Sequence, residues 1–410
     1  MTKPKTYEER LAHPFESPVI KFSEIQAAVP AHLRTRSFAW AMLYVIRCST
    51  FSWMFYVLAT RIDSSGILNA VPGLRWAAWA AYWFWQSVAW AGIFTLAHEA
   101  GHDNVSDYKA LNYSVGYILH SFLLAPHFSW RATHNAHHKY TNSIEKDENW
   151  VPRTREMYNL PPEEKASEMD YEDLFGDTPI YTLGRLIAQQ VLGWPAYLID
   201  NTLGNPVYPR WTNHFSPYSP LFKPKERSLI AISDVGVFIM AVILYRWTQE
   251  VGAAAFMKLY LIPWLLSNHW LVMLTFLHHS DPSIPHYETG EWTWLRGSLA
   301  TVDRPLLGWV GRVFLHNVSH DHVAHHLFPH IPFYNLPKVT EAIKPVLKDD
   351  YNYDNTNTFV ALWRSFKSCV FVDRSSDGIV FYKDGKGKTH RSVKSPSKDG
   401  SVPSVTTKSE

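Results

Sequence analysis

Four apolar stretches along the chain are long enough to cross a lipid bilayer, which takes about 20 residues in a helix. Trp and Tyr gather near their ends, as expected for side chains at the two membrane surfaces. The alternative is a set of buried helices in a large soluble protein, which Arg47 and Asp234 favour because charges are costly in lipid. Short links join the stretches in pairs, so the pattern predicts two helical hairpins. The stretches cover about residues 38–60, 76–97, 229–247 and 255–277, with links at 61–75 and 248–254.

Long polar segments, 98–228 and 278–372, follow the second and the fourth stretch. Both fall on the same side of the membrane if all four spans form. The positive-inside rule makes that side cytosolic, because the basic flanks there are Arg34, Arg36, Lys223, Lys225 and Arg227. Within the first segment, 111–127 and 181–203 are apolar but broken by Gly, Pro or charge, which predicts helices at the membrane surface. The sequence therefore predicts an all-α membrane protein, with four transmembrane helices in two hairpins and a cytosolic helical cap.

This pattern divides the chain into three parts. Residues 1–37 are predicted to be a cytosolic N-terminal segment, and they lack the apolar core of a signal peptide. Residues 38–372 form the membrane domain with its cap. Residues 373–410 are predicted to be a polar, disordered tail, since 385–410 consist mostly of Lys, Ser, Thr, Gly and Pro.

Composition narrows the possible functions. Charged residues make up 19% of the chain, whereas soluble domains carry about 25%. The net charge of +2 gives no reason to expect nucleic acid as a partner. Two cysteines, Cys48 and Cys369, are too few for a disulfide framework or a thiolate metal site. Histidine stands out instead, with 21 in the chain.

Histidines recur in three short motifs, which we call the first, second and third histidine boxes. Residues three and four apart share one face of a helix, so each box presents its imidazoles in one direction. All three boxes lie just beyond the predicted spans, on the predicted cytosolic face. Their eight histidines are twice what one metal needs, which predicts two metal ions side by side. The boxes are His98-Glu99-Ala100-Gly101-His102, His134-Asn135-Ala136-His137-His138 and His322-Val323-Ala324-His325-His326.

Two other classes of protein share parts of this pattern. The first box also fits H-E-x-x-H, the signature of zinc proteases with Glu99 as general base. That site needs one further ligand and an open position for water, and it leaves two boxes unused. A membrane metal transporter or sensor would place its ligands near the bilayer midplane, inside the spans. Here the boxes sit beyond the span ends, which argues against transport.

Motifs outside the boxes extend the pattern, namely Gly193-Trp194-Pro195, Phe215–Pro220, Pro282–Tyr287 and Trp294–Arg304. With these motifs and the three boxes, the chain resembles membrane fatty acyl desaturases. The resemblance is to the plant and fungal oleate (delta-12) branch and its omega-3 relatives, and it covers roughly residues 20–370. It implies two iron ions that activate dioxygen as a co-substrate. The ligands it implies are His98, His102, His134, His137, His138, His322, His325 and His326.

A ninth histidine just beyond the last membrane helix is implied by the same resemblance. His279 occupies the matching place, with His278 as the nearest rival and His316 as a further one. His120 and His316 match histidines of this branch and are expected to orient ligand imidazoles by hydrogen bonds. For each alone, an ordinary packed or exposed histidine is an equal alternative. Asp147, after the second box, is expected to hold a ligand histidine through its carboxylate.

The activity that the resemblance implies is acyl-lipid desaturation. Dioxygen and two electrons would insert a cis double bond into a monounsaturated 18-carbon acyl chain, turning oleoyl into linoleoyl. Ala100 stands where most relatives of this branch have cysteine, and His320-Asp321 precedes the third box where many delta-12 enzymes have Asp-Thr. Leu327–Pro332 resembles the omega-3 relatives instead. The alternatives within the class are an omega-3 or bifunctional desaturase, and a diverged hydroxylase, acetylenase or conjugase.

Partners and location follow from the same resemblance. No His-Pro-Gly-Gly heme motif of a fused cytochrome b5 domain occurs in the sequence. Electrons are therefore expected from a separate cytochrome b5 and its reductase. The acyl carrier would be a phospholipid or acyl-CoA. The expected location is the endoplasmic reticulum membrane, with several spans and with both termini and all three boxes in the cytosol.

Overall fold

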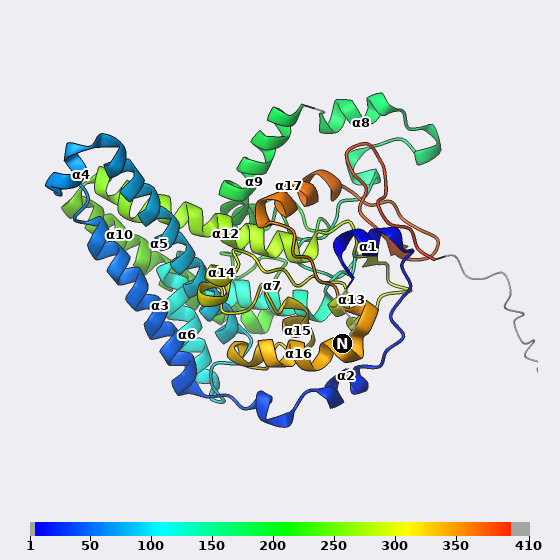
Figure 1. The fold of residues 1–410 in the computed structure, drawn as a ribbon, viewed down its shortest axis with the longest axis horizontal. Helices are drawn as coiled ribbons and strands as arrows, with labels where there is room; N and C mark the ends of the chain where they lie inside the picture. The colour runs from blue at the N-terminus through cyan, green and yellow to red at the C-terminus, as the bar shows by residue number, and fades with distance from the viewer. Residues whose placement is uncertain (1–4, 177, 395–410) are drawn as a thin grey trace, which may run out of the picture.

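The computed structural model describes residues 5–176 and 178–394, which are mostly helical (Figure 1). One turn, η5 (Met257–Leu261), is π-helical. The 3₁₀ turns are η1 (Ala31–Arg34), η2 (Glu156–Tyr158), η3 (Glu163–Lys165), η4 (Pro224–Glu226), η6 (Phe333–Asn335) and η7 (Lys348–Asp350). Two short strands, β1 (His286–Tyr287) and β2 (Ile379–Val380), pair in antiparallel fashion. The helices are α1 (Tyr7–Ala12), α2 (Phe22–Ala28), α3 (Phe38–Ala59), α4 (Gly66–Ala70), α5 (Pro72–Gly101), α6 (Lys109–Phe122), α7 (His127–Tyr140), α8 (Glu168–Phe175), α9 (Pro179–Asp200), α10 (Arg227–Val251), α11 (Ala253–Phe256), α12 (Ile262–His279), α13 (Trp294–Leu299), α14 (Trp309–Phe314), α15 (His322–Leu327), α16 (Leu336–Leu347) and α17 (Thr358–Ser368).

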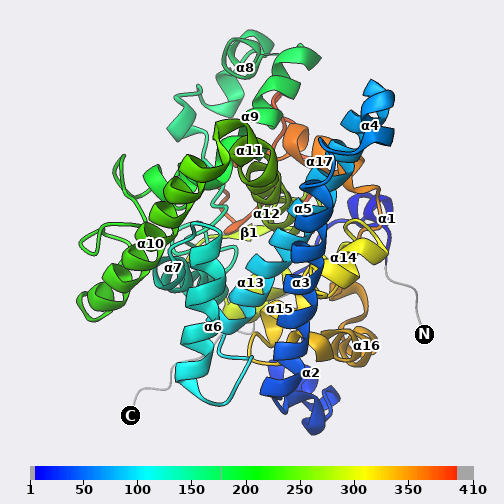
Figure 2. The same ribbon diagram turned by 90° about the vertical axis from the view of Figure 1, so that its left-hand side faces the viewer.

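Helix α5 is the centre of the long-helix bundle. It packs against α3, α6 and α12, and α12 also packs against α9. Figure 2 shows α6 and α7 between α5 and α10. The shorter helices α13, α15 and α16 lie at the end of the bundle away from α4 (Figure 1), whereas α14 packs against α5. The last turns of α5 and α12, which carry histidines, therefore point into the region that these short helices enclose.

Three helical segments in the described part of the chain are long and apolar enough to cross a membrane, namely Phe38–Ala59, Pro224–Val251 and Ala253–His279. They match the first, third and fourth predicted spans. The second predicted span, 76–97, lies in the 30-residue helix α5. Residues 86–100 of α5 are buried by other parts of the chain. The helical class is confirmed, whereas the second predicted span, 76–97, does not meet these criteria of length and composition.

The arginine within the first span has partners from the cap. The Arg47 guanidinium donates to the carbonyl oxygen of Val313, and one of its nitrogens lies 3.3 Å from Nδ1 of His316. Both partners lie at or just after α14, so this short cap helix packs against α3 in the middle of the first span. A partnered arginine costs much less in an apolar setting than a free one. Arg47 is therefore compatible with a membrane helix.

The contact between α5 and α14 depends on a glycine. A β-carbon at Gly92 would lie 2.3 Å from the carbonyl oxygen of Phe314 and 3.0 Å from Sγ of Cys48. We expect Gly92→Ala to lower the free energy of unfolding by about 1–3 kcal/mol, because backbone has to shift in a packed core. Thermal unfolding of the purified protein measures this. Gly66→Ala is the matched control, since a β-carbon there meets nothing within 4 Å, and equal melting temperatures for the two variants would contradict the prediction.

The segment after residue 372 corrects the prediction of a disordered tail from 373 onward. Strand β2 pairs with β1, and Phe381 and Tyr382 are buried beside it. Farther along, Phe15 forms a parallel bridge with Val393. These apolar residues lie between polar, glycine-rich stretches whose composition concealed them. The predicted disorder of residues 395–410 falls outside the described part of the chain.

Candidate metal centre

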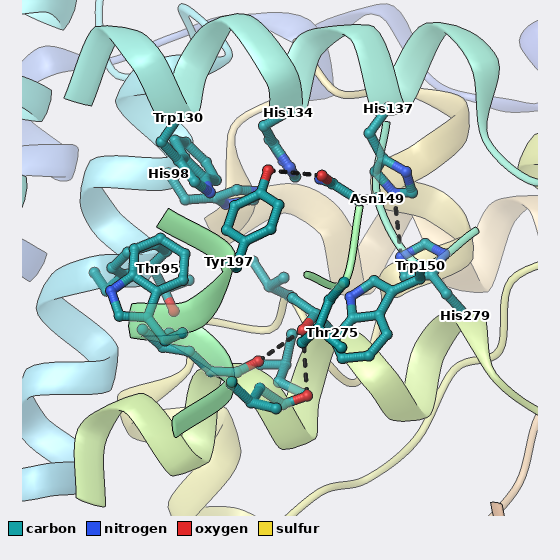
Figure 3. A pocket seen from close by; sticks show the side chains of 18 of the residues that line it. Thr95, His98, Trp130, His134, His137, Asn149, Trp150, Tyr197, Thr275 and His279 are labelled. Carbon is teal, nitrogen blue, oxygen red and sulfur yellow. Dashed lines mark hydrogen bonds between the residues drawn. The ribbon is translucent and has the colours of Figure 1, made fainter. Parts of the chain in front are cut away.

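Four helices bring the three histidine boxes together. The first box ends α5, the second lies on α7, and the third forms α15, while His279 is the last residue of α12. Figure 3 shows histidines of α5, α7 and α12 along one wall of a cavity. Each box has the helical spacing that the sequence predicted, and the imidazoles meet at the point where these helices converge. Eight of the nine candidate histidines are buried, and His134 is partly buried.

The histidines form two groups. In the first group, five side chains offer nitrogens within 4.8 Å of one another: His98, His102, His134, His138 and His325. Nε2 of His102 lies 3.2 Å from Nε2 of His98 and 3.0 Å from Nε2 of His134. Nε2 of His138 lies 3.1 Å from Nε2 of His134. We call this set the first histidine group.

The second histidine group contains His137, His279, His322 and His326. Nε2 of His279 lies 3.3 Å from Nε2 of His137 and 3.1 Å from Nε2 of His322. Nε2 of His326 lies 3.1 Å from Nε2 of His322. A metal–imidazole bond of about 2.1 Å puts neighbouring ligand nitrogens about 3.0–3.4 Å apart at usual coordination angles. The spacing within both groups therefore fits one metal ion each.

The positions of the imidazole protons also fit a cation. Nδ1 of His137 lies 2.7 Å from a carboxylate oxygen of Asp147, and Nδ1 of His322 lies 3.1 Å from the carbonyl oxygen of Val318. Both oxygens only accept hydrogen bonds, so the ring proton is on Nδ1 and Nε2 carries a lone pair. Both lone pairs point at Nε2 of His279, which can donate a hydrogen bond to only one of them. A cation at that point would coordinate both.

Burial favours the uncharged form of most of these imidazoles. It lowers the pKa well below the ordinary histidine value for four of them, His134, His138, His322 and His326. A neutral imidazole binds a metal without first losing a proton. The two groups therefore offer ligands in the protonation state that a metal needs.

Two side chains near the groups were not recognised as partners from the sequence. Glu99 is fully buried, and its carboxylate lies 2.8 Å from Nδ1 of His98 and 3.8 Å from Nδ1 of His325. The sequence assigned Glu99 only the role of general base in a zinc protease. Oγ1 of Thr141 lies 3.2 Å from Nδ1 of His326, and its hydroxyl donates to the carbonyl of His137. The contacts of Glu99 with His325 and of Thr141 with His326 join segments that are distant in sequence. The spacing of residues along the chain therefore gave little indication of them.

The remaining candidates do not belong to either group. Nδ1 of His278 lies 2.5 Å from the carbonyl of Val302, and its ring stacks on His322. His120 faces His127, with Nδ1 atoms 2.9 Å apart, and His316 faces Arg47. Within the described residues, no hydrogen bond joins His120 or His316 to either group. Of the rivals for the ninth position, His279 alone joins the second group.

A cavity borders both groups. Its histidines are His98 and His134 of the first group with His137, His279 and His322 of the second. Most of the other wall is aromatic or aliphatic, formed by Phe94, Trp130, Trp150, Trp194, Leu203, Leu271, Val272, Leu274 and Val318. Its few hydroxyls are occupied within the protein (Figure 3), since Tyr197 bonds to Asn149 at 2.7 Å and Thr275 to the Leu271 carbonyl at 2.9 Å. The cavity therefore suits a long apolar chain.

Comparison with known proteins agrees with this site. Residues 75–357 match the fatty acid desaturase family. The chain belongs to that family. This desaturase is 41% identical over 374 residues to the Delta(12) fatty acid desaturase of Mortierella isabellina, covering 90% of this chain and 92% of that protein. It is 40% identical over 375 residues to the Delta(12)-fatty-acid desaturase of Arabidopsis thaliana, covering 90% of this chain and 93% of that protein. It is also 37% identical over 386 residues to the Acyl-lipid (9+3)-(E)-desaturase of Dimorphotheca sinuata, covering 93% of this chain and 97% of that protein.

The family assignment decides between the classes of protein that the sequence left open. This desaturase is an oxidoreductase and neither a zinc protease nor a metal transporter. The geometry agrees, because Glu99 lies against two histidines of the first group and the two remaining boxes complete the same site.

Asp147 gives a direct test of how the second group is held. Its carboxylate contacts His137 and accepts from the backbone N–H of Asn142 at 2.8 Å and of Asn149 at 3.0 Å. We expect Asp147→Asn to weaken metal binding about 10–100-fold, since the amide holds the imidazole less firmly. Metal retained after dialysis against graded chelator measures this. Asp107→Asn, at an exposed ion pair with Arg36, should retain wild-type metal, and equal retention by both variants would contradict the prediction.

Proposed function

We propose that this desaturase converts oleoyl to linoleoyl chains on a membrane lipid by inserting a cis double bond at the delta-12 position. The observation that carries the proposal is the position of two buried imidazole groups on the wall of one apolar cavity. The names of the relatives from Mortierella isabellina and Arabidopsis thaliana support the position of the new bond. The reaction consumes dioxygen, two electrons and two protons, and it releases two molecules of water.

The metal ligands are part of this proposal. The first group, with His98, His102, His134, His138 and His325, would hold one iron. The second, with His137, His279, His322 and His326, would hold the other. Imidazole ligands suit iron as well as zinc. Two bound irons would supply the activation of dioxygen that an unactivated methylene requires and no side chain provides.

The chain's own residues would bind and orient the substrate. The apolar wall excludes water and holds the acyl chain in one path past the histidines. Tyr197 and Asn149, bonded to each other, form the part of the wall beside His134 and His137 (Figure 3). Asn149 also donates its backbone N–H to Asp147, the partner of His137. The substrate wall and the second histidine group are therefore coupled through one short network.

Topology and location complete the proposal. Helix α5 would supply the remaining span, 76–97. Both hairpins would then cross the endoplasmic reticulum membrane, and the cap would face the cytosol. A separate cytochrome b5 and its reductase would then deliver electrons from the cytosolic side. The three apolar helical segments support membrane insertion, and the basic flanks support the orientation.

Expression in a yeast whose lipids contain no polyunsaturated chains tests the proposed activity. We expect a new 18:2 fatty acid, with its second double bond at carbon 12 by mass spectrometry of a derivatised sample. A bond at the omega-3 position, a trans bond or a hydroxyl group would instead favour the alternatives within the class. An unchanged lipid profile, with both protein and electron donor present, would contradict desaturation. Purified protein should contain two irons per chain.

A further inference from the structure

We propose that a second cavity, next to the acyl cavity, binds the phosphodiester of the glycerophospholipid that carries the acyl chain. This inference rests on the proposed function and names the chemistry of its acyl carrier. We call this second, partly open cavity the vestibule. Trp150 and Leu203 line both cavities. They also bond to each other, since the backbone N–H of Trp150 donates to the carbonyl of Leu203 at 2.9 Å.

The vestibule lies where the acyl cavity could open. Trp150 and Leu203 form part of the wall of both spaces, and the ring of Trp150 packs against Phe276 with centroids 5.3 Å apart. Phe276 lines the vestibule, whereas Leu274 and Thr275 before it line the acyl cavity. A side-chain movement at Trp150 would join the two spaces into one channel. Such a channel would be apolar at the histidines and polar at its outer end.

Charge distinguishes the vestibule from the acyl cavity. Arg153 and Arg185 line it, and none of the described residues lining it is acidic. Arg185 donates to the Phe175 carbonyl at 3.2 Å, and within the described residues neither arginine has a carboxylate partner within 4.0 Å. Arg155, two residues from Arg153, shows the usual arrangement, because it pairs with Asp373. Two exposed guanidinium groups beside a cavity without a counter-charge favour an anionic ligand, and arginine suits phosphate in particular.

An unpartnered amide adds a further polar group. Nε2 of Gln189 is buried and has no hydrogen-bond partner among the residues that the structure describes. Gln189 lines the vestibule one helical turn after Arg185 on α9, and Gly193 and Tyr197 continue that row along the acyl cavity. From Gln189 to Tyr197 the helix rises about 12 Å. A single helix therefore presents hydrogen-bond donors at its start and an apolar wall at its end, as an amphiphilic ligand requires.

The surface of α9 indicates that the ligand comes from the membrane. Its outward side chains include large apolar ones that are about half exposed or more, namely Ile180, Tyr181, Ile187, Leu192 and Ile199. Such a helix rests in the interface between head groups and acyl chains. Arg185 then lies at the level of lipid phosphates, beside a cavity that leads to the histidines. A water-soluble acyl carrier would have no need of an entrance at that level.

Lipid binding and turnover together test this inference. We would assemble the iron-loaded enzyme in nanodiscs and compare wild type with Arg153→Gln/Arg185→Gln, using dioleoyl-phosphatidylcholine and dioleoylglycerol as probes. These probes share their acyl chains and differ in the phosphate ester. We expect KM for the phospholipid to rise about tenfold or more, because two charge-assisted hydrogen bonds are lost, with kcat little changed. KM for the diacylglycerol should stay the same.

Controls separate this inference from the proposed function and from misfolding. Arg210→Gln, at an exposed position that lines neither cavity, should behave as wild type. Arg153→Lys/Arg185→Lys should restore part of the phospholipid affinity. Native mass spectrometry of retained phosphatidylcholine needs no turnover, so it would detect the loss of binding even if the enzyme acts on another chain. Equal KM changes for both probes, or an unchanged KM for the phospholipid, would overturn the inference. A third assay with oleoyl-CoA completes the test, because a loss of activity confined to that substrate would overturn it as well.

Discussion

Replacing His137 with alanine is expected to abolish 18:2 formation and to reduce bound iron to about one ion per chain, as two separate sites imply. His137 supplies Nε2 to the second histidine group, 3.3 Å from Nε2 of His279. Its removal also leaves the buried carboxylate of Asp147 without its imidazole partner, and an unpaired buried charge is costly. Both effects weaken the second group and leave the five histidines of the first group in place. Product analysis and iron content of the purified protein measure the two outcomes.

Folding has to be monitored in the same experiment. His32→Ala is a suitable control, because His32 is an exposed histidine outside both groups. It should keep wild-type activity, iron content and elution volume in detergent. The His137→Ala variant should elute at the same volume, since α7 is also held by contacts with α5, α6 and α10. Wild-type activity in a well-folded His137→Ala protein would remove His137 from the proposed ligands.

Helical periodicity predicted most of the histidine site. It placed each box on one helix face, and it made the surplus of histidines a sign of two metals. Helical periodicity also explains why the histidines of one box divide between the two histidine groups, because successive residues on a helix differ by about 100° in direction. His134 and His138, about 40° apart on this scale, join the first group, whereas His137 joins the second. In the third box, His322 and His326 share a group and His325 joins the other.

Contacts between distant segments could not be predicted in this way. The order of the helices around the site decides which group receives each pair, and that order depends on packing along the whole bundle. The contact of Glu99 with His325 joins α5 to α15, and the contact of Thr141 with His326 joins the end of α7 to α15. His120 and His316 match histidines of the family in sequence, yet their hydrogen-bond partners in the described residues are His127 and Arg47. The cavity also arises only when α9 and α12 meet.

Filling the acyl cavity from α9 is expected to have the second-largest effect on activity. Gly193 lines the cavity, and a β-carbon there would already lie 3.3 Å from Cγ2 of Val272 and 3.4 Å from Cδ1 of Leu203. The larger side chain of Gly193→Leu would occupy space that the acyl chain needs. Displacing the reacting carbons by about 1 Å is enough to lower kcat/KM roughly 100-fold. Initial rates with dioleoyl-phosphatidylcholine in nanodiscs measure this loss.

The same helix offers a control for this substitution. Gly184 also lies on α9, and a β-carbon there meets nothing within 4 Å. Gly184→Leu should therefore keep wild-type rates, although both variants gain the same helix propensity from losing a glycine. Iron content should be unchanged in both, because Gly193 contacts the substrate space and no histidine of either group. A loss of iron in Gly193→Leu would locate its effect at the metal centre, and equal rates for the two variants would show that this cavity does not hold the acyl chain.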